Sequence, residues 1–343
     1  MTDEAGALLR RLEHAFAASP IAGDDQLRHL AGALTRLMAG AADPLAQGCA
    51  ALTAWQSRHP LEESAVAALF GAVLDALHRD ARSEPPTGPA RALLGRLETI
   101  EPRLAHYLFR GACGWPPCPA EPALVAWLGT QRDRFAPVLA CGLSSAPKKA
   151  LALGDAAIRS RADWSAAIEA AGAVDGDVTI GRYAEARAVY DTKAYASIFD
   201  PRDRRNVHLG IDLGVPAGTA VHAPLEGTVH SFADNDIAGD YGPTIILEHR
   251  PKGLAVAFYT LYGHLQRRSL DGLAPRGAIA RGERIGWIGE EHENGGWPPH
   301  LHFQIVTDML GLEGNYYGVG EAGKLELWTS LCPDPNLILG LEL

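Results

Sequence analysis

The sequence predicts a multidomain α + β protein in which an N-terminal all-α helical domain precedes an all-β antiparallel domain. Up to about residue 172 the chain is rich in alanine and leucine, and its apolar residues recur at helical spacing. From residue 173 it changes to short β-branched or aromatic runs that glycine and proline separate. A length of 343 residues is sufficient for two cores. We therefore predict a helical domain over 1–172 and a sheet domain over 173–343.

The helices of the first half are indicated by stripes of apolar side chains. The stripes consist of Leu8, Leu9, Leu12 and Phe16, then Leu27, Leu30, Leu34 and Leu37, then Val66, Phe70, Val73 and Leu77. Segments such as SPIAGDD and SEPPTGP separate them. Further helices are expected at 90–110, 121–144 and 162–172. This half has no dense cluster of ionisable residues, so its sequence leaves its role open.

Charge and hydropathy argue against several classes of partner. A formal net charge of −10 disfavours a large nucleic-acid surface and an anionic membrane as partner. No stretch approaches the roughly eighteen apolar residues of a transmembrane helix. The N-terminus MTDEAGALLRRLEHAF has acids before any base and an interrupted apolar run, unlike a signal peptide. We therefore expect a cytoplasmic protein that binds neither nucleic acid nor membrane, with export by another route left open.

The five cysteines favour reduced thiols over a disulfide framework, because their number is odd. Cys113 and Cys118 lie close together in GACGWPPCP, but no second Cys or His pair at ligand spacing accompanies them. Two buried, small apolar side chains are a better interpretation than half of a structural zinc site.

Two short blocks, HLGID and HLH, carry the clearest functional signal. The side chains of a strand alternate between its faces, so His208 and Asp212 share one face, as do His300 and His302. Two neighbouring strands of this kind can bring two imidazoles and a carboxylate to one metal ion. Three ligands of these types with an open position are typical of catalytic zinc. Within HLGIDLG, Gly210 and Gly214 are expected to let the backbone approach the ion closely.

A third block, LYGHL, places His264 just after a predicted strand. Since two histidines and one carboxylate suffice for the ion, two imidazoles remain for the acid and base chemistry of metal-assisted hydrolysis. In HLHFQI, Leu301 and Phe303 are expected to face the core. The other histidines of this half, of which His222 is nearest to the first block, have no partner at ligand spacing.

HLGID, GHL and HLHF in this order resemble the lysostaphin-type (LytM-like) zinc metallopeptidases, and the likeness covers about residues 180 to 310. The resemblance implies an antiparallel β domain with a groove over one zinc ion per chain. It implies His208, Asp212 and His302 as zinc ligands, His300 as general base and His264 as the residue that stabilises the transition state. The implied activity is cleavage of peptide cross-links, as in peptidoglycan endopeptidases, often at glycine.

The chain departs from this family in the loop before the last block, GEEHENGGWPPHLHF. Trp297, Pro298 and Pro299 make it longer and bulkier than usual, and we expect them to stiffen and narrow one wall of the groove. The Pro-rich tail LCPDPNLIL has no assigned role.

Three functions are consistent with these residues. The first is a zinc-dependent hydrolase of peptide (amide) bonds. The second is an intracellular amide hydrolase that acts on a small or non-wall substrate, and the third is a non-cleaving binding or regulatory module of the same fold. In each case the helical domain could bind a protein partner or cover the groove.

Overall fold

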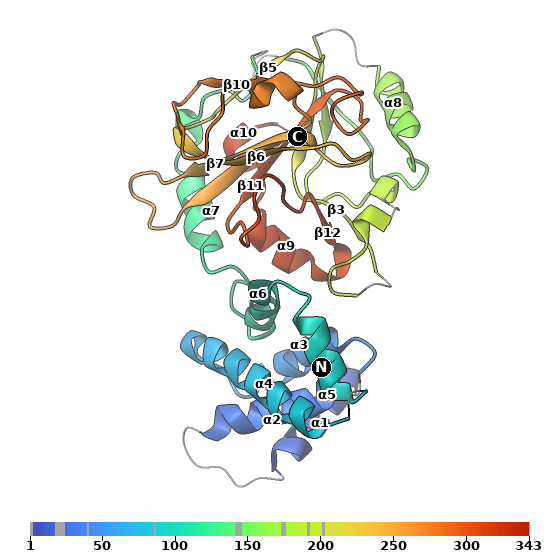
Figure 1. Ribbon diagram of the computed structural model, residues 1–343, viewed down its shortest axis with the longest axis vertical. Coiled ribbons are helices and arrows are strands. Elements are labelled where there is room, and N and C mark those ends of the chain that lie inside the picture. The colour runs from blue at the N-terminus through green and yellow to red at the C-terminus, as the bar shows by residue number, and fades with distance from the viewer. Residues whose placement is uncertain are drawn as a thin grey trace. The chain divides into compact units, whose positions relative to one another are not determined.

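The chain forms two compact units in the computed structural model (Figure 1). The helical unit comprises Met1–Pro117 with Ile198–Asp200, and the sheet unit comprises Cys118–Ser197 with Pro201–Leu343. The residues that the structure describes are 3–17, 25–39, 41–85, 87–140, 146–172, 176–190, 193–200 and 203–342. None of the helices described in these ranges is long and apolar enough to cross a membrane.

The described residues of the helical unit form helices and no strand. Their bounds are α1 Asp3–Ala17, α2 Asp25–Ala39, α3 Pro44–Gln56, α4 Glu63–Ser83, α5 Pro89–Leu97 and α6 Pro102–Ala112. The predicted stripes face inward, since Leu12, Leu34 and Leu77 are fully buried. Asp43 caps the start of α3 with its side chain. The predicted all-α character of this part is confirmed, while the side chain of Phe16 lies outside the described residues.

Two of the expected helices have different bounds. The helix expected at 90–110 is two helices, because Pro102 lacks a backbone N–H and begins α6. The helix expected at 121–144 is wrong over 130–140, because α7 (Glu121–Gly129) ends at Gly129, and residues 141–144 lie outside the described residues. The chain continues there through η1 (Arg132–Arg134), and an isolated bridge joins Leu139 to another part of the sheet unit.

The segment before residue 172 also contains a strand, β1 (Lys148–Ala150), where only helices were expected. It is followed by α8 (Arg161–Ala170), close to the helix expected at 162–172. The reason is packing, because this segment completes the core of the sheet unit, with Leu124 and Leu128 of α7 fully buried in it. The two units therefore divide after Pro117, and the predicted domain bounds of 1–172 and 173–343 stay a prediction.

The sheet unit is built on one eight-stranded sheet with the order β1-β2-β4-β11-β8-β7-β6-β9. All its pairs are antiparallel except β1 with β2. The remaining bounds in this sheet are β2 Val178–Gly181, β4 Ile211–Gly214, β6 Gly227–Asn235, β7 Gly242–His249, β8 Phe258–Gly263, β9 Ala278–Ile279 and β11 His300–Val306. Two small sheets pair β3 (Arg205–His208) with β12 (Val319–Glu321), and β5 (Ala220–His222) with β10 (Arg284–Trp287). Two further helices, α9 (Leu325–Leu331) and α10 (Asn336–Leu339), lie near the C-terminus.

The central strand β11 separates the core from the polar face. Leu301, Phe303 and Ile305 are fully buried in one apolar core, to which α7 and the α10 region contribute. The period of two then places His300 and His302 on the opposite face. The predicted orientation of Leu301 and Phe303 toward the core is confirmed.

The buried His249 predicts that the sheet unit loses stability in mild acid. Burial lowers the pKa of His249 to about 4, from about 6.5 in an unfolded chain. Its contribution is therefore complete above pH 6.5 and is lost as the pH falls from 6.5 to about 4, and a shift of this size corresponds to roughly 3 kcal/mol. His249→Gln should flatten the decline in unfolding free energy between pH 7 and pH 4.5, measured by urea denaturation. The exposed His292→Gln is the control, and equal slopes in both variants would contradict the expectation.

Candidate active site

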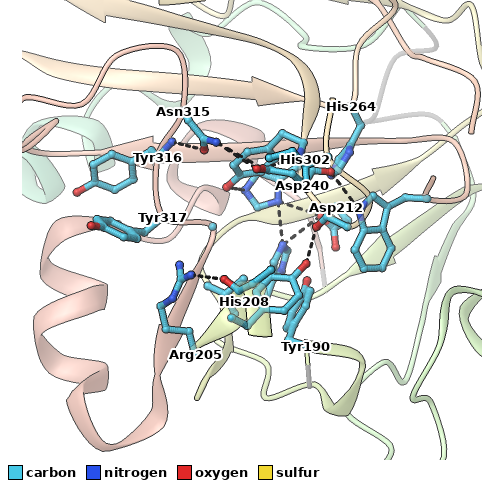
Figure 2. A pocket seen from close by; sticks show the side chains of 18 of the residues that line it. Tyr190, Arg205, His208, Asp212, Asp240, His264, His302, Asn315, Tyr316 and Tyr317 are labelled. Carbon is cyan, nitrogen blue, oxygen red and sulfur yellow. Dashed lines mark hydrogen bonds and ion pairs between the residues drawn. The ribbon is translucent and has the colours of Figure 1, made fainter. Parts of the chain in front are cut away.

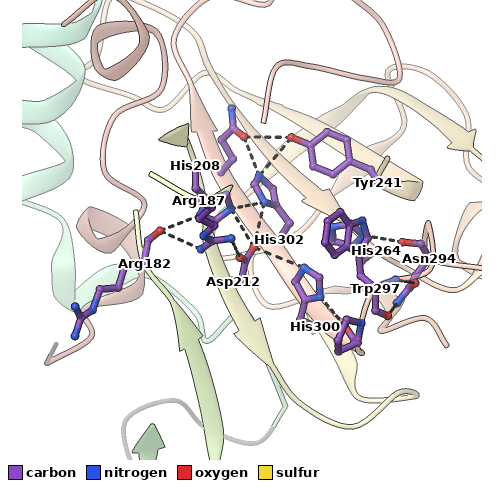
Figure 3. A network of polar contacts seen from close by, with 12 residues as sticks. Arg182, Arg187, His208, Asp212, Tyr241, His264, Asn294, Trp297, His300 and His302 are labelled. Carbon is purple, nitrogen blue, oxygen red and sulfur yellow. Dashed lines mark hydrogen bonds and ion pairs between the residues drawn. The ribbon is translucent and has the colours of Figure 1, made fainter. Parts of the chain in front are cut away.

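Three potential metal ligands converge on one point of the sheet unit (Figure 3). Asp212 on β4 lies opposite His302 on β11 in the antiparallel register, and β3 ends at His208. The Oδ1 atom of Asp212 lies 3.1 Å from Nε2 of His208 and 3.2 Å from Nδ1 of His302. In the described chain this is the one group of at least three His, Cys, Asp or Glu residues whose ligand atoms lie within 4.8 Å of one another.

Each of the four imidazoles at the site turns one nitrogen outward to an oxygen acceptor. The pairs are His208 Nδ1 with the Arg182 carbonyl (2.9 Å), His302 Nε2 with Gln304 Oε1 (2.9 Å), His300 Nδ1 with the Pro298 carbonyl (2.7 Å) and His264 Nδ1 with the Asn294 carbonyl (2.8 Å). An oxygen acceptor fixes the N–H on its own side of the ring, so the inward nitrogen of a neutral imidazole keeps its lone pair. This is the tautomer needed both for a metal ligand and for a proton acceptor.

A buried arginine holds the central carboxylate from behind. The Nη1 atom of Arg187 donates to Oδ2 of Asp212 at 2.7 Å, and its Nε donates to Glu185 at 3.0 Å. Burial alone would raise the pKa of Asp212, but His208 and Arg187 hold that pKa well below its ordinary value. Asp212 is therefore a carboxylate with Oδ2 paired and Oδ1 turned toward the two imidazoles.

The remaining two histidines form a pair beside this cluster. The rings of His264 and His300 have centroids 4.2 Å apart, and Nε2 of His300 lies 3.7 Å from Oδ1 of Asp212. Burial lowers the pKa of His300, and burial together with the neighbouring His300 and His302 holds the pKa of His264 well below its ordinary value. His264 adopts a positive φ of 63° directly after β8, which turns its ring toward the cluster. The histidines expected to do chemistry are thus neutral at pH 7.

Two tryptophans form one wall. The ring of Trp297 lies 5.3 Å from that of Trp164 on α8, and its Nε1 donates to the Asp240 carbonyl at 3.2 Å. Trp164 also lies 5.2 Å from the ring of His300 and under the guanidinium of Arg187. Trp297 of the loop before the last block thus forms part of this wall, and the Pro298 carbonyl accepts the hydrogen bond of His300, while the expected stiffening and narrowing of the groove stay a prediction.

The cluster opens into a pocket of about 500 Å³ (Figure 2). Its walls are largely aromatic and include Tyr190, Tyr195, Tyr241, Tyr316 and Tyr317. At the rim lies Ile237, whose side chain is 64% exposed and is the large apolar side chain most open to solvent among the described residues.

The sequence did not reveal several residues that complete the site. Arg187 and Trp164 come from segments without a motif, and no local signal marks them. Gln304 follows the HLH block at the same period of two, so alternation could have identified it. His222, which was singled out for its proximity in sequence, pairs with Arg284 between β5 and β10 and does not line the described pocket.

A carboxylate and two oriented imidazoles at one point, with two further imidazoles beside them, form a ligand set of the kind that catalytic metal sites use. Residues 206–313 match the model described as peptidase family M23. This part of the sheet unit is therefore a peptidase M23 (LytM-type) domain, and the resemblance predicted from the sequence is confirmed.

The chain is similar to two curated proteins over about a third of its length. It is 30% identical over 119 residues to the peptidoglycan DD-endopeptidase ShyA of Vibrio cholerae. The aligned region covers 33% of this chain and 24% of that protein. It is 34% identical over 117 residues to an uncharacterized metalloprotease of Haemophilus influenzae, covering 32% and 22%. The chain thus matches less than a quarter of the length of each relative.

Two solved structures are similar to this chain at lower sequence identity. A zinc containing peptidase from Vibrio cholerae matches with a TM-score of 0.24 and 27% identity over 30% of this chain and 28% of that chain. The catalytic domain of lysostaphin from Staphylococcus simulans matches with a TM-score of 0.25 and 21% identity over 35% and 80%.

The two glycines of HLGIDLG serve close packing in different ways. A Cβ at Gly214 would lie 2.0 Å from Oγ1 of Thr179 on β2, so this glycine admits a neighbouring strand. A Cβ at Gly210 would lie 2.5 Å from Cε1 of His302. The absence of a side chain at Gly210 therefore leaves room for the His302 ring.

Gly210→Ala should therefore displace His302 and weaken metal binding by about tenfold or more, as is usual when the surroundings of a ligand are disturbed. The measurement is zinc affinity by competition with a chromophoric chelator. Gly323→Ala is the matched control, because no atom lies within 4 Å of its Cβ position. Unchanged affinity in Gly210→Ala would contradict the assignment of His302.

Proposed function

We propose that the M23 domain is a zinc-dependent hydrolase of peptide (amide) bonds that acts by activating water. The observation that supports this best is the orientation of the imidazoles, each fixed from outside by an oxygen acceptor, with the other nitrogen of His208, His300 and His302 within 4 Å of Asp212 Oδ1. Histidines that are merely exposed or structural would not require four rings around one point to direct their N–H groups outward in this way.

The donor set fits a single zinc ion per chain. His208, Asp212 and His302 offer two nitrogens and one carboxylate oxygen, which is a common ligand set for catalytic zinc. Zinc in this position supplies a Lewis acid and lowers the pKa of a bound water toward neutrality. Arg187 keeps Asp212 ionised and oriented for this role.

We assign His300 as the general base. Its Nδ1–H is held by the Pro298 carbonyl, and its Nε2 points to the cluster within 3.7 Å of Asp212. Its lowered pKa keeps it neutral at pH 7, so it can accept a proton from the attacking water. The ring of Trp164 packs against that of His300, with centroids 5.2 Å apart.

We assign His264 to the oxyanion that develops on the substrate carbonyl. Because its Nδ1–H is committed to the Asn294 carbonyl, its Nε2 can donate to an oxyanion only after gaining a proton. The His300 ring is close enough for the two imidazoles to interact strongly. The proton that His300 takes from the water would therefore have to pass to Nε2 of His264 before this imidazole could donate to the oxyanion, and it would leave with the amine when the peptide bond breaks.

The substrate that the similarity favours is a peptide cross-link of peptidoglycan, because ShyA is described as a peptidoglycan DD-endopeptidase. The non-cleaving module is less favoured because all five histidine and aspartate positions of the resemblance are present, and the intracellular amide substrate is less favoured because the similar ShyA is described as a peptidoglycan enzyme. The helical unit is proposed to bind a protein partner or to control access to the pocket.

Metal analysis tests the assignment of ligands. Purified protein should contain about one zinc per chain under zinc-replete conditions, and His208→Ala should lose it. His300→Ala should retain zinc and lose about a hundredfold or more of the hydrolysis rate, as for removal of a general base. Loss of zinc in His300→Ala, with zinc retained in His302→Ala, would reverse the two roles. A wild-type protein that binds no zinc would refute the proposal.

A panel of cross-linked muropeptides and unrelated cytosolic peptides and amides tests the substrate. Zinc-dependent cleavage confined to the muropeptides is expected. Cleavage confined to the unrelated peptides or amides would favour the intracellular amide hydrolase. No cleavage by a zinc-loaded protein would favour the binding module.

A further inference from the structure

The part of the pocket beyond the cluster carries a cation and an anion on its walls. Arg205 at the start of β3 and Asp240 before β7 both line it, together with aromatic side chains such as Tyr316 and Tyr317 (Figure 2). Both side chains are half-buried. They are close enough for the charge of Arg205 to lower the pKa of Asp240, against the larger effect of burial that raises it.

Arg205 is held in place without a carboxylate partner among the described residues. Its Nε donates to the Ala196 carbonyl at 3.2 Å and its Nη2 donates to the Ala194 carbonyl at 2.8 Å. Its guanidinium also lies 5.4 Å from the ring centroid of Tyr317. Two neutral carbonyls and an aromatic ring orient the cation without neutralising it, and Nη1 is left to meet an anion.

Asp240 is held in a similar way without a cationic partner in the described chain. The backbone N–H of Tyr241 donates to Oδ1 at 2.7 Å, and the amide of Asn315 lies 3.4 Å from Oδ2. These donors fix the carboxylate but leave Oδ2 with capacity for a stronger partner. An ion pair between Asp240 and Arg205 would satisfy both groups, yet the structure keeps them apart.

We propose that this part of the pocket binds the free end of an α-amino acid residue of the substrate, with its carboxylate on Arg205 and its ammonium on Asp240. The ammonium and the carboxylate of such a group are attached to the same carbon. This arrangement suits two oppositely charged side chains that face one pocket without touching. The aromatic walls and the apolar rim at Ile237 accept an aliphatic side chain that leads from this carbon to the bond being cleaved. The inference rests on the proposed function, because it names the substrate class of that same site.

A peptide with only a C-terminal carboxylate would use Arg205 and leave Asp240 unpaired. A peptide with only a free amine would do the reverse. In a half-buried site, a charged side chain without a partner loses part of its solvation free energy. A peptide that lacks either the free ammonium or the free carboxylate should therefore bind less tightly.

Three small probes test the inference on the full-length, zinc-loaded protein: norleucine, norleucine amide and N-acetylnorleucine. Binding is measured by NMR titration and repeated on metal-free protein, where chelation of zinc by the amino acid cannot contribute. Free norleucine should bind about tenfold more tightly than either blocked form, which equals about 1.4 kcal/mol. Equal binding of all three by wild-type protein would overturn the proposal, whatever the variants do.

Two variants assign the two charges separately. Arg205→Gln should abolish the preference over norleucine amide and keep the preference over N-acetylnorleucine, whereas Asp240→Asn should do the opposite. The exposed Arg284→Gln and Asp271→Asn, both outside the pocket, should keep both preferences. Preferences that persist unchanged in Arg205→Gln and Asp240→Asn would place the binding elsewhere and refute the assignment.

The outcome separates this inference from the proposed function. Selective binding of norleucine by a protein that hydrolyses no peptide would retain the amino-acid site and reject the enzyme. Zinc-dependent hydrolysis together with indifference to the three probes would retain the enzyme and reject the site.

Discussion

The carboxylate of Asp212 is the interaction on which the rest of the site depends. It is buried, and its two oxygens have separate partners: Arg187 takes Oδ2, while His208 and His302 face Oδ1. An ionised carboxylate without such partners would be expensive to bury. The same pairing that makes burial tolerable also fixes the direction of the oxygen offered to a metal, so stability and chemistry are served by one set of contacts.

The sheet fixes the spacing of the proposed ligands, and segments outside the matched domain contribute further residues to the site. The register of β4 with β11 sets Asp212 against His302, and neighbouring antiparallel strands hold such a spacing rigidly. Arg187 and Trp164, however, precede residues 206–313 that match the peptidase family. Residues that complete the site therefore come from the part of the sheet unit upstream of the matched domain, while α7 contributes to its apolar core.

The residues that could be predicted from the sequence were those with a local signal. Period-two spacing in HLGID and HLH placed four side chains on the polar face, the LYGHL block added His264 after a predicted strand, and the resemblance implied the role of each residue. Arg187 and Trp164 could not be predicted, because their positions arise from pairing and packing between distant segments. For the same reason the helix expected at 121–144 was too long, since the sheet core and not the local apolar pattern decides where α7 ends.

The proposed arrangement of the site has two imidazoles and the Asp212 carboxylate holding the metal while His300 and His264 stay free. X-ray absorption spectroscopy at the zinc edge of the zinc-loaded protein tests it most directly. We predict a shell of light atoms at about 2.0–2.1 Å that includes two imidazoles and no sulfur, and that is disturbed in Asp212→Asn but not in His300→Ala. Three or four coordinated imidazoles in the wild-type protein would contradict the account.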